Sequence, residues 1–201
     1  MADAEPVRTT EHEEVKRAEL LLELYVKAQA LTDKELYDYV LDKAVELTGS
    51  TIGFFHKVAE DQNTVILTTW NAAALESCDA SYDTHYPVTD AGNWLDCLRQ
   101  GRPILYNDFP KSPNQKGLPE GHTPLKRFMS VPVWEGNKVR YIFGVGNKPK
   151  DYGEPDVVQT QLIANELTKI MMQRRAEFEL KESEERLSLA TRSAGIGVWD
   201  W

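Results

Sequence analysis

Cysteine and histidine are the residues of this sequence with the most distinctive chemistry, and there are two cysteines and four histidines. Neither cysteine, Cys78 or Cys97, belongs to a CxxC pair, so the sequence offers no thiol framework for structural zinc. Neither has a basic neighbour that would activate a thiolate, and Cys97 follows Trp94 at helical spacing, where a packing thiol is favoured. The sequence therefore predicts neither thiol catalysis nor a disulfide.

The four histidines could bind iron or hydrogen-bond an anion through the imidazole ring. His12 lies on a predicted N-terminal helix, and His56 shares a strand face with two apolar residues, which favours a hydrogen-bonded core histidine. His85 and His122 fall in predicted pocket-side loops and are the histidines that we expect near a ligand. Because no rigid element sets their spacing, no metal site is predicted, and the cofactor is left unknown.

A long segment rich in Pro, Gly and Asn, residues 107–122, has the length of a lid or a binding loop. Aromatic residues around it can line an apolar pocket, and a few polar residues can converge there, as in most small-molecule sites. The predicted ligand-binding residues are Trp70, His85, Trp94, Tyr106, Asn107, Asp108, His122 and Arg127. The structural alternative is that Asn107 and Asp108 cap the loop, while Arg127 pairs with a surface carboxylate.

The composition restricts the classes of function. A net charge of −9 and the lack of a basic stripe argue against nucleic-acid binding. No window approaches 18 uncharged apolar residues, so the sequence predicts no membrane span. The N-terminus lacks the basic and apolar regions of a signal peptide, and thiols are sparse, so we expect a cytoplasmic protein.

The pattern of the sequence predicts the elements that would hold these residues. Thr32 and Glu35 have the spacing of a capping box, and no Gly or Pro interrupts the sequence from Asp156 to Ala194. In order, the predicted elements are a helix at 11–30, a helix from Thr32 to Gly49, a hairpin of 51–58 with 64–70, a helix from Asp90 to Gly101, a strand at 103–106, a hairpin of 128–134 with 138–145, and a long exit helix. This order predicts an α+β fold, in which an antiparallel sheet carries terminal helices on one face and pocket loops on the other.

Several short motifs together resemble a GAF domain of the kind found in bacterial signalling proteins. They are His85-Tyr-Pro87, Ala91-Gly-Asn-Trp94, Asn107-Asp108, Gly117-Leu-Pro-Glu-Gly-His122, Val131-Pro-Val133 and Gly144-Val-Gly-Asn-Lys148 with Tyr152 and Asp156. Residues 180–201 resemble the connector helix and first strand of a PAS domain. The resemblance implies an N-terminal segment at 1–19, a GAF domain at 20–175, a connector helix at 176–192 and the truncated start of a PAS domain at 193–201.

Members of the GAF family carry out three kinds of chemistry whose signature residues can be compared with this sequence: cyclic-nucleotide binding, bilin attachment and sulfoxide reduction. The run Asn147-Lys148 with Tyr152 and Asp156 resembles the signature of cyclic-nucleotide-binding GAF domains, but Tyr replaces the usual Phe and Val157 replaces a Glu. A structural ion pair between Lys148 and Asp156 is therefore expected at this corner. Residues 121–128 lack the cysteine by which phytochrome-type GAF domains attach bilin, and two cysteines are fewer than sulfoxide-reducing GAF domains use.

The resemblance implies a ligand-sensing module that passes small-molecule occupancy through a helical linker to PAS and output domains in the same chain. The fragment itself is expected not to be an enzyme, whereas a full-length protein of this type would be a histidine kinase or a diguanylate cyclase. A homodimer is expected through an apolar stripe on the exit helix: Leu162, Ile163, Leu167, Ile170 and Met171. The alternatives are a ligand-free dimerisation scaffold, or a haem or redox sensor.

Overall fold

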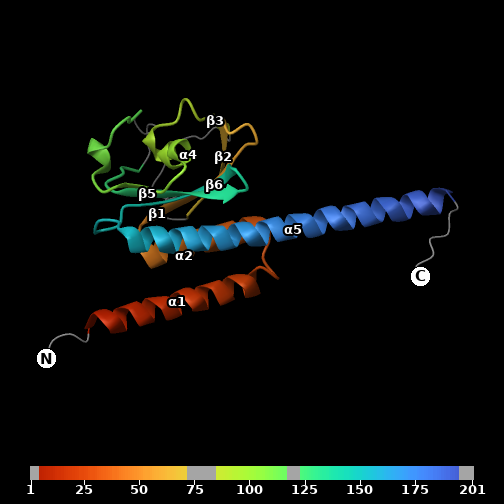
Figure 1. Cartoon of the computed structure of the whole chain (residues 1–201), viewed down its shortest axis with the longest axis horizontal. Coiled ribbons are helices and arrows are strands. Elements are labelled where there is room, and N and C mark those ends of the chain that lie inside the picture. Colours follow the sequence, from red (N-terminus) through yellow and green to blue (C-terminus); the bar gives the residue numbers. More distant parts are fainter. Residues whose placement is uncertain (1–4, 72–84, 117–122, 195–201) are drawn as a thin grey trace. The chain divides into compact units, whose positions relative to one another are not determined.

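The computed structural model describes residues 5–71, 85–116 and 123–194, and it divides the chain into two units, 1–167 and 168–201 (Figure 1). The helices of the described residues are α1 (Glu5–Lys27), α2 (Asp33–Thr48), α4 (Asp96–Gln100) and α5 (Glu154–Ala194), with 3-10 turns η1 (Asn93–Leu95) and η2 (Phe109–Lys111). The strands are β1 (Ile52–Val58), β2 (Thr64–Trp70), β3 (His85–Pro87), β4 (Ile104–Tyr106), β5 (Phe128–Glu135) and β6 (Lys138–Gly146). Among these helices, none contains an apolar stretch long enough to span a bilayer.

The strands of the described residues form one antiparallel sheet in the order β3-β2-β1-β6-β5-β4. Both predicted hairpins are confirmed, because β1 pairs with β2 and β5 pairs with β6. The pairing of β1 with β6 joins the two hairpins in the centre of the sheet. Pro132 lies where β5 extends beyond β4, so its missing N–H interrupts no ladder, and its carbonyl accepts a hydrogen bond from Gln161 Nε2 at 2.9 Å.

The sheet separates a helix-covered face from a face with loops, as the α+β prediction required (Figure 1). Alternation along β1 shows the two faces: Phe55 stacks on Tyr37 of α2 at 5.0 Å between ring centroids, whereas Phe54 contacts Trp94 of η1 at 5.8 Å. Gly53 faces α2, where an added Cβ would meet Val45 and Leu41. Helix α2 and the first turns of α5 thus cover one face of the sheet. The opposite face carries η1, α4 and the loops.

The capping box of α2 is confirmed, since the Thr32 hydroxyl accepts a hydrogen bond from Glu35 N and the Glu35 carboxylate accepts one from Thr32 N. Two predicted helix starts are wrong. The first helix begins at Glu5 and not at residue 11, because Pro6 lies in its first turn, where proline is tolerated. The middle helix begins as the 3-10 turn η1 with Gly92 at its N-cap, so Asp90 does not cap it.

The predicted long exit helix is confirmed, and α5 runs for 41 residues without a break. The dimer stripe predicted on it is wrong for four of its five members. Ile163, Leu167, Ile170 and Met171 are buried within the single chain, and only Leu162 is exposed. The predicted connector at 176–192 lies in the later part of α5. Of the expected start of a PAS domain at 193–201, residues 193–194 end α5 and residues 195–201 lie outside the described residues.

Candidate functional site

An aromatic cluster on the loop-bearing face of the sheet forms the base of the candidate site. Its centre is Phe54 of β1, whose ring centroid lies 4.7 Å from that of His56, 5.9 Å from that of Trp70 and 5.9 Å from that of Phe128. Trp94 meets the Phe54 ring edge-on at 5.8 Å. Such offset and edge-on contacts hold the rings in fixed orientations, so the base of the site is preorganised.

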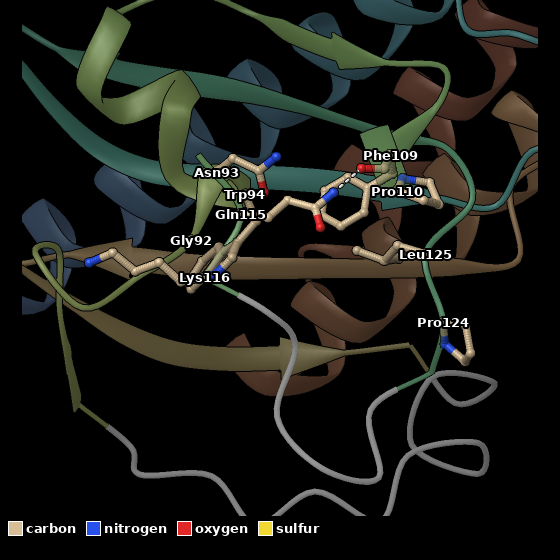
Figure 2. A pocket seen from close by; sticks show the side chains of 9 residues that line it. All are labelled: Gly92, Asn93, Trp94, Phe109, Pro110, Gln115, Lys116, Pro124 and Leu125. Carbon is tan, nitrogen blue, oxygen red and sulfur yellow. Dashed lines mark hydrogen bonds between the residues drawn. The ribbon is translucent and has the colours of Figure 1, made fainter. Parts of the chain in front are cut away.

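A cavity of about 240 Å³ lies beside this cluster, between η1 and the segment that follows η2 (Figure 2). Five of its lining residues are apolar or aromatic, namely Trp94, Phe109, Pro110, Pro124 and Leu125. Gly92, Asn93, Gln115 and Lys116 complete the lining. A mainly apolar cavity with a few polar groups is the usual form of a small-molecule site.

A single arginine fixes the rim of this cavity, and sequence reasoning missed it. Arg99 of α4 donates hydrogen bonds to the carbonyl oxygens of Val88, Ala91 and Gly92 at 2.7 to 2.8 Å. It also pairs with the buried Asp96 carboxylate at 2.8 Å. Because the guanidinium fork is planar and rigid, these bonds hold the turn and the residues that follow it, 88–92, against α4. The (i, i+3) spacing of an acid and an arginine was the available signal.

Asp96 also fixes one of the predicted ligand-binding residues. The Tyr106 hydroxyl donates to Asp96 Oδ2 at 2.6 Å, and its ring packs edge-on against Phe109 at 6.2 Å. Burial, together with the hydrogen bond to Asp96, raises the pKa of Tyr106 to about 12. Tyr106 therefore stays neutral and supports the cavity wall from behind, without lining the cavity.

Three other predicted residues lie outside the cavity lining and have protein partners. The Asn107 side chain pairs with the backbone of Tyr152, accepting from Tyr152 N at 2.8 Å and donating to Tyr152 O at 3.0 Å. Asp108 forms an exposed ion pair with Lys111, and Arg127 pairs with Asp151 at 2.8 Å. The ion pair of Arg127 is the one that the structural alternative predicted. The predicted loop caps are wrong, because Asp108 makes no capping hydrogen bond at η2 and Asn107 binds the distant backbone of Tyr152.

Of the remaining predicted residues, Trp94 lines the cavity and Trp70 is part of the aromatic cluster. His85 begins β3, and His122 lies outside the described residues, as Cys78 does. Within the described part of the chain, no group of three or more His, Cys, Asp and Glu side chains could hold a metal ion.

The motif around Asn147 forms the corner between β6 and α5. Asn147 has a φ of 61° and holds the segment before β5, accepting from Lys126 N at 2.8 Å and donating to Pro124 O at 2.9 Å. Lys148 forms an ion pair with Asp156 at 2.6 Å, and Asp156 also accepts from Gly153 N at 2.9 Å, which caps the start of α5. This motif therefore supports the cavity through Pro124 without contacting its interior directly.

Residues 30–172, most of the chain, match the family model of the GAF domain. The chain belongs to the GAF domain family. It is 34% identical over 176 residues to the methyl sulfide methyltransferase-associated sensor of Methanosarcina acetivorans, and the alignment covers 87% of this chain but only 18% of that protein. The chain is thus related to a sensor protein of which it spans a small part.

Solved structures show the same GAF fold at low sequence identity. The GAF domain of a phosphoenolpyruvate-protein phosphotransferase from Coxiella burnetii superposes with a TM-score of 0.66 at 14% identity, covering 81% of this chain and 96% of that one. The free methionine-R-sulfoxide reductase from Neisseria meningitidis superposes with a TM-score of 0.63 at 13% identity, covering 80% and 91% of the two chains. At these identities, the likeness concerns the fold alone.

Cys97 does not have the exposure or the low pKa of a reactive thiol. Cys97 lies in α4 and is completely buried, and this burial raises the pKa of its thiol to about 12. A thiol with so high a pKa stays protonated and is a poor nucleophile at neutral pH. Its position agrees with the packing role that the sequence predicted.

Proposed function

We propose that this GAF domain is the sensory module of a larger signalling protein and that it binds a small molecule in the cavity beside the aromatic cluster. The observation that carries the proposal is the cavity itself, which has an apolar lining that includes Trp94 and Phe109, next to a rigid aromatic base. The similarity of this chain to a sensor protein also supports the proposal that the domain is a sensory module. Ligand binding would exchange the solvent in an apolar cavity for packed contacts, which is favourable.

The proposal includes the route by which occupancy is passed on. The later residues of α5 continue the helix that begins at the 147–156 corner, so that α5 is suited to connect the GAF domain to PAS and output domains further along a cytoplasmic chain. A histidine kinase or a diguanylate cyclase would be such an output. Couplings of this kind between a ligand site and an output domain amount to about 1–3 kcal/mol.

Ligand binding is tested by a thermal-shift screen of small metabolites, with and without a substitution that fills the cavity. A compound present at a hundredfold excess over its Kd should stabilise the protein by about 2.7 kcal/mol, which raises the melting temperature by several degrees. In Gly92→Leu the shift should disappear, because a Cβ at Gly92 has only ordinary contacts, 3.5 Å or longer, while the rest of the leucine would occupy the cavity.

Fluorescence provides the matched control for this screen. A bound compound should quench Trp94, which lines the cavity, so that Trp94→Phe should lose the ligand-dependent change. Trp134 on β5 is 48% exposed and is not part of the lining, so Trp134→Phe should retain the change. A shift that persists in Gly92→Leu, or a change that Trp94→Phe retains, would place the ligand elsewhere.

We also propose that the protein is a homodimer through the later part of α5, in place of the stripe that the sequence predicted. Leu180 and Leu187 are seven residues apart, so they share one heptad position, and they are 61% and 64% exposed. Ala176, Ser183 and Ala190 lie three or four residues from them and occupy the second position of the same seam. Replacing both leucines by Glu should convert a dimer to a monomer in light scattering, because two carboxylates would then face the seam.

The control for the dimer is Phe178→Glu, since Phe178 is 67% exposed but lies off the seam of Leu180 and Leu187. This variant should stay dimeric. A double leucine variant that keeps the mass of a dimer would rule out this seam as the interface.

A further inference from the structure

Two carboxamide side chains line the cavity, Asn93 and Gln115, and the hydrogen bonds around Ser112 determine which end of Asn93 faces it. The Ser112 hydroxyl donates its single hydrogen to the carbonyl oxygen of Phe109 at 2.5 Å. It can therefore only accept from Asn93, whose Nδ2 lies 2.6 Å away. The nitrogen of Asn93 is thus directed at Ser112, and its oxygen is directed away.

The same argument applies to Gln115. Its Nε2 donates to the carbonyl oxygen of Phe109, which can only accept, and also to Ser112 Oγ at 3.1 Å. Figure 2 shows this nitrogen directed at Phe109, with the Gln115 oxygen turned the other way. Among the described residues, neither Asn93 Oδ1 nor Gln115 Oε1 has a hydrogen-bond partner. The cavity lining therefore includes two amide oxygens, and the nitrogen of each amide donates to the protein.

An acceptor of this kind can take a donor from outside the protein. Asn93 is only 2% exposed, so a hydrogen bond to its oxygen from a molecule in the cavity would be shielded from competing solvent. Asn93 belongs to the lining of the cavity, so a molecule in the cavity is in the right place to donate. The orientation of the amides thus selects ligands that carry an N–H or O–H group.

The charges of the lining select against ionic ligands. Among the described residues of the lining, Lys116 carries a charge, and Figure 2 shows its side chain running away from the other lining residues. Its ammonium group donates to the carbonyl oxygen of Thr89. The described residues of the lining include no carboxylate, so a cationic ligand would lose its hydration without gaining an opposite charge from them.

We infer that the cavity takes an uncharged, planar aromatic or heteroaromatic compound of one or two rings that carries one N–H or O–H donor. The volume of about 240 Å³ lies below the range of drug-sized pockets, which fits so small a compound. Trp94 and Phe109 supply aromatic surface for the rings, and the two amide oxygens accept the donor. This inference rests on the proposed function, because it names the class of ligand for the same cavity.

The test compares three probes that share one ring system and differ in one group: 2-naphthol, 2-methoxynaphthalene and 2-naphthoate. Titration calorimetry on the full chain at neutral pH measures each Kd. The donor-bearing 2-naphthol should bind about tenfold more tightly than either of the other two, as expected for one buried hydrogen bond. Gly92→Leu should abolish binding, and Gln115→Met should reduce the preference for 2-naphthol over the methyl ether.

A spectroscopic measurement avoids dependence on variants. At equal occupancy, the side-chain amide resonances of Asn93 and Gln115 should shift further with 2-naphthol than with 2-methoxynaphthalene, because only 2-naphthol can donate to their amide oxygens. If 2-naphthoate or 2-methoxynaphthalene bound more tightly than 2-naphthol, the inference about the ligand class would be overturned. If Gly92→Leu abolished that binding, the cavity would still be a binding site. Failure of all three probes would also overturn the inference, and the proposed function would fall only if the metabolite screen failed too.

Discussion

Acidification from pH 7 to pH 5 is expected to lower the free energy of unfolding by about 2 kcal/mol through His56 alone. His56 is 1% exposed in the aromatic cluster, where burial lowers its pKa to about 3 from an ordinary value of 6.5. Its Nδ1 accepts a hydrogen bond from Thr68 N at 3.2 Å, so that the folded protein favours the neutral ring.

The direction of the effect follows from where each state binds the proton. Above pH 6.5, His56 is neutral in both the folded and the unfolded chain, and it contributes no pH dependence. Below pH 6.5, His56 binds a proton in the unfolded chain, whereas in the folded chain it stays neutral down to about pH 3. The free energy of unfolding then falls by about 1.4 kcal/mol for each pH unit across this window.

The measurement is urea unfolding at several pH values, with His56→Gln as the reference. Glutamine can still accept from Thr68 N but cannot titrate, so His56→Gln should lose less stability between pH 7 and pH 5 than the wild type, by about 2 kcal/mol. Carboxylates contribute equally to both proteins and cancel in the comparison. Equal slopes in the two proteins would mean that His56 takes up its proton in the folded state.

Replacing Gly144 by Ala is expected to destabilise the protein by about 3 kcal/mol, the upper part of the range for overpacking a core. Gly144 of β6 lies opposite Phe54 of β1, and an added Cβ would overlap the Cε1 and Cζ atoms of the Phe54 ring. This ring cannot move freely, since it packs against His56 and Trp94 and stacks on Phe128. The loss should appear in the midpoint of urea unfolding.

A double-mutant cycle isolates the clash. Phe54→Leu removes the ring, so that the double variant with Gly144→Ala should be about 1–2 kcal/mol more stable than the sum of the single changes predicts. Gly92→Ala is the matched glycine control and should have a small effect, because its Cβ would meet no atom closer than 3.5 Å. Additive losses in the cycle would show that Phe54 is not what Gly144 accommodates.

Local patterns were sufficient to predict most of the elements of this fold. Alternation in β1 and the β-branched residues of β2 predicted the first hairpin, and the absence of Gly and Pro after Asp156 predicted α5. The capping box at Thr32 was predicted because its two bonds are made within four residues. Where local signals were weak, as before η1, the bonds that Arg99 makes decided the structure, and sequence spacing does not report these bonds.

The candidate site was harder to predict than the fold. Trp94 was predicted and lines the cavity, but Asn107 and Arg127 have partners in the 151–152 segment that only the folded chain brings near. Asn93 and Gln115 were not predicted, since the significance of an amide here depends on Ser112 and the Phe109 carbonyl. Residue type indicated polar groups near an aromatic site, but it could not indicate which of them face inward.

The pairing of Asn107 with Tyr152 has a mechanical consequence. The Asn107 carboxamide accepts from the N–H of Tyr152 and donates to its carbonyl oxygen, as the backbone of a neighbouring strand would. These two hydrogen bonds link residue 107 to residue 152. Asn107 lies two residues before Phe109 in the cavity wall, and Tyr152 lies two residues before the first residue of α5. Under the proposed function, a ligand that pushed this wall outward would move Asn107 and, through its two hydrogen bonds, the backbone of Tyr152 just before α5.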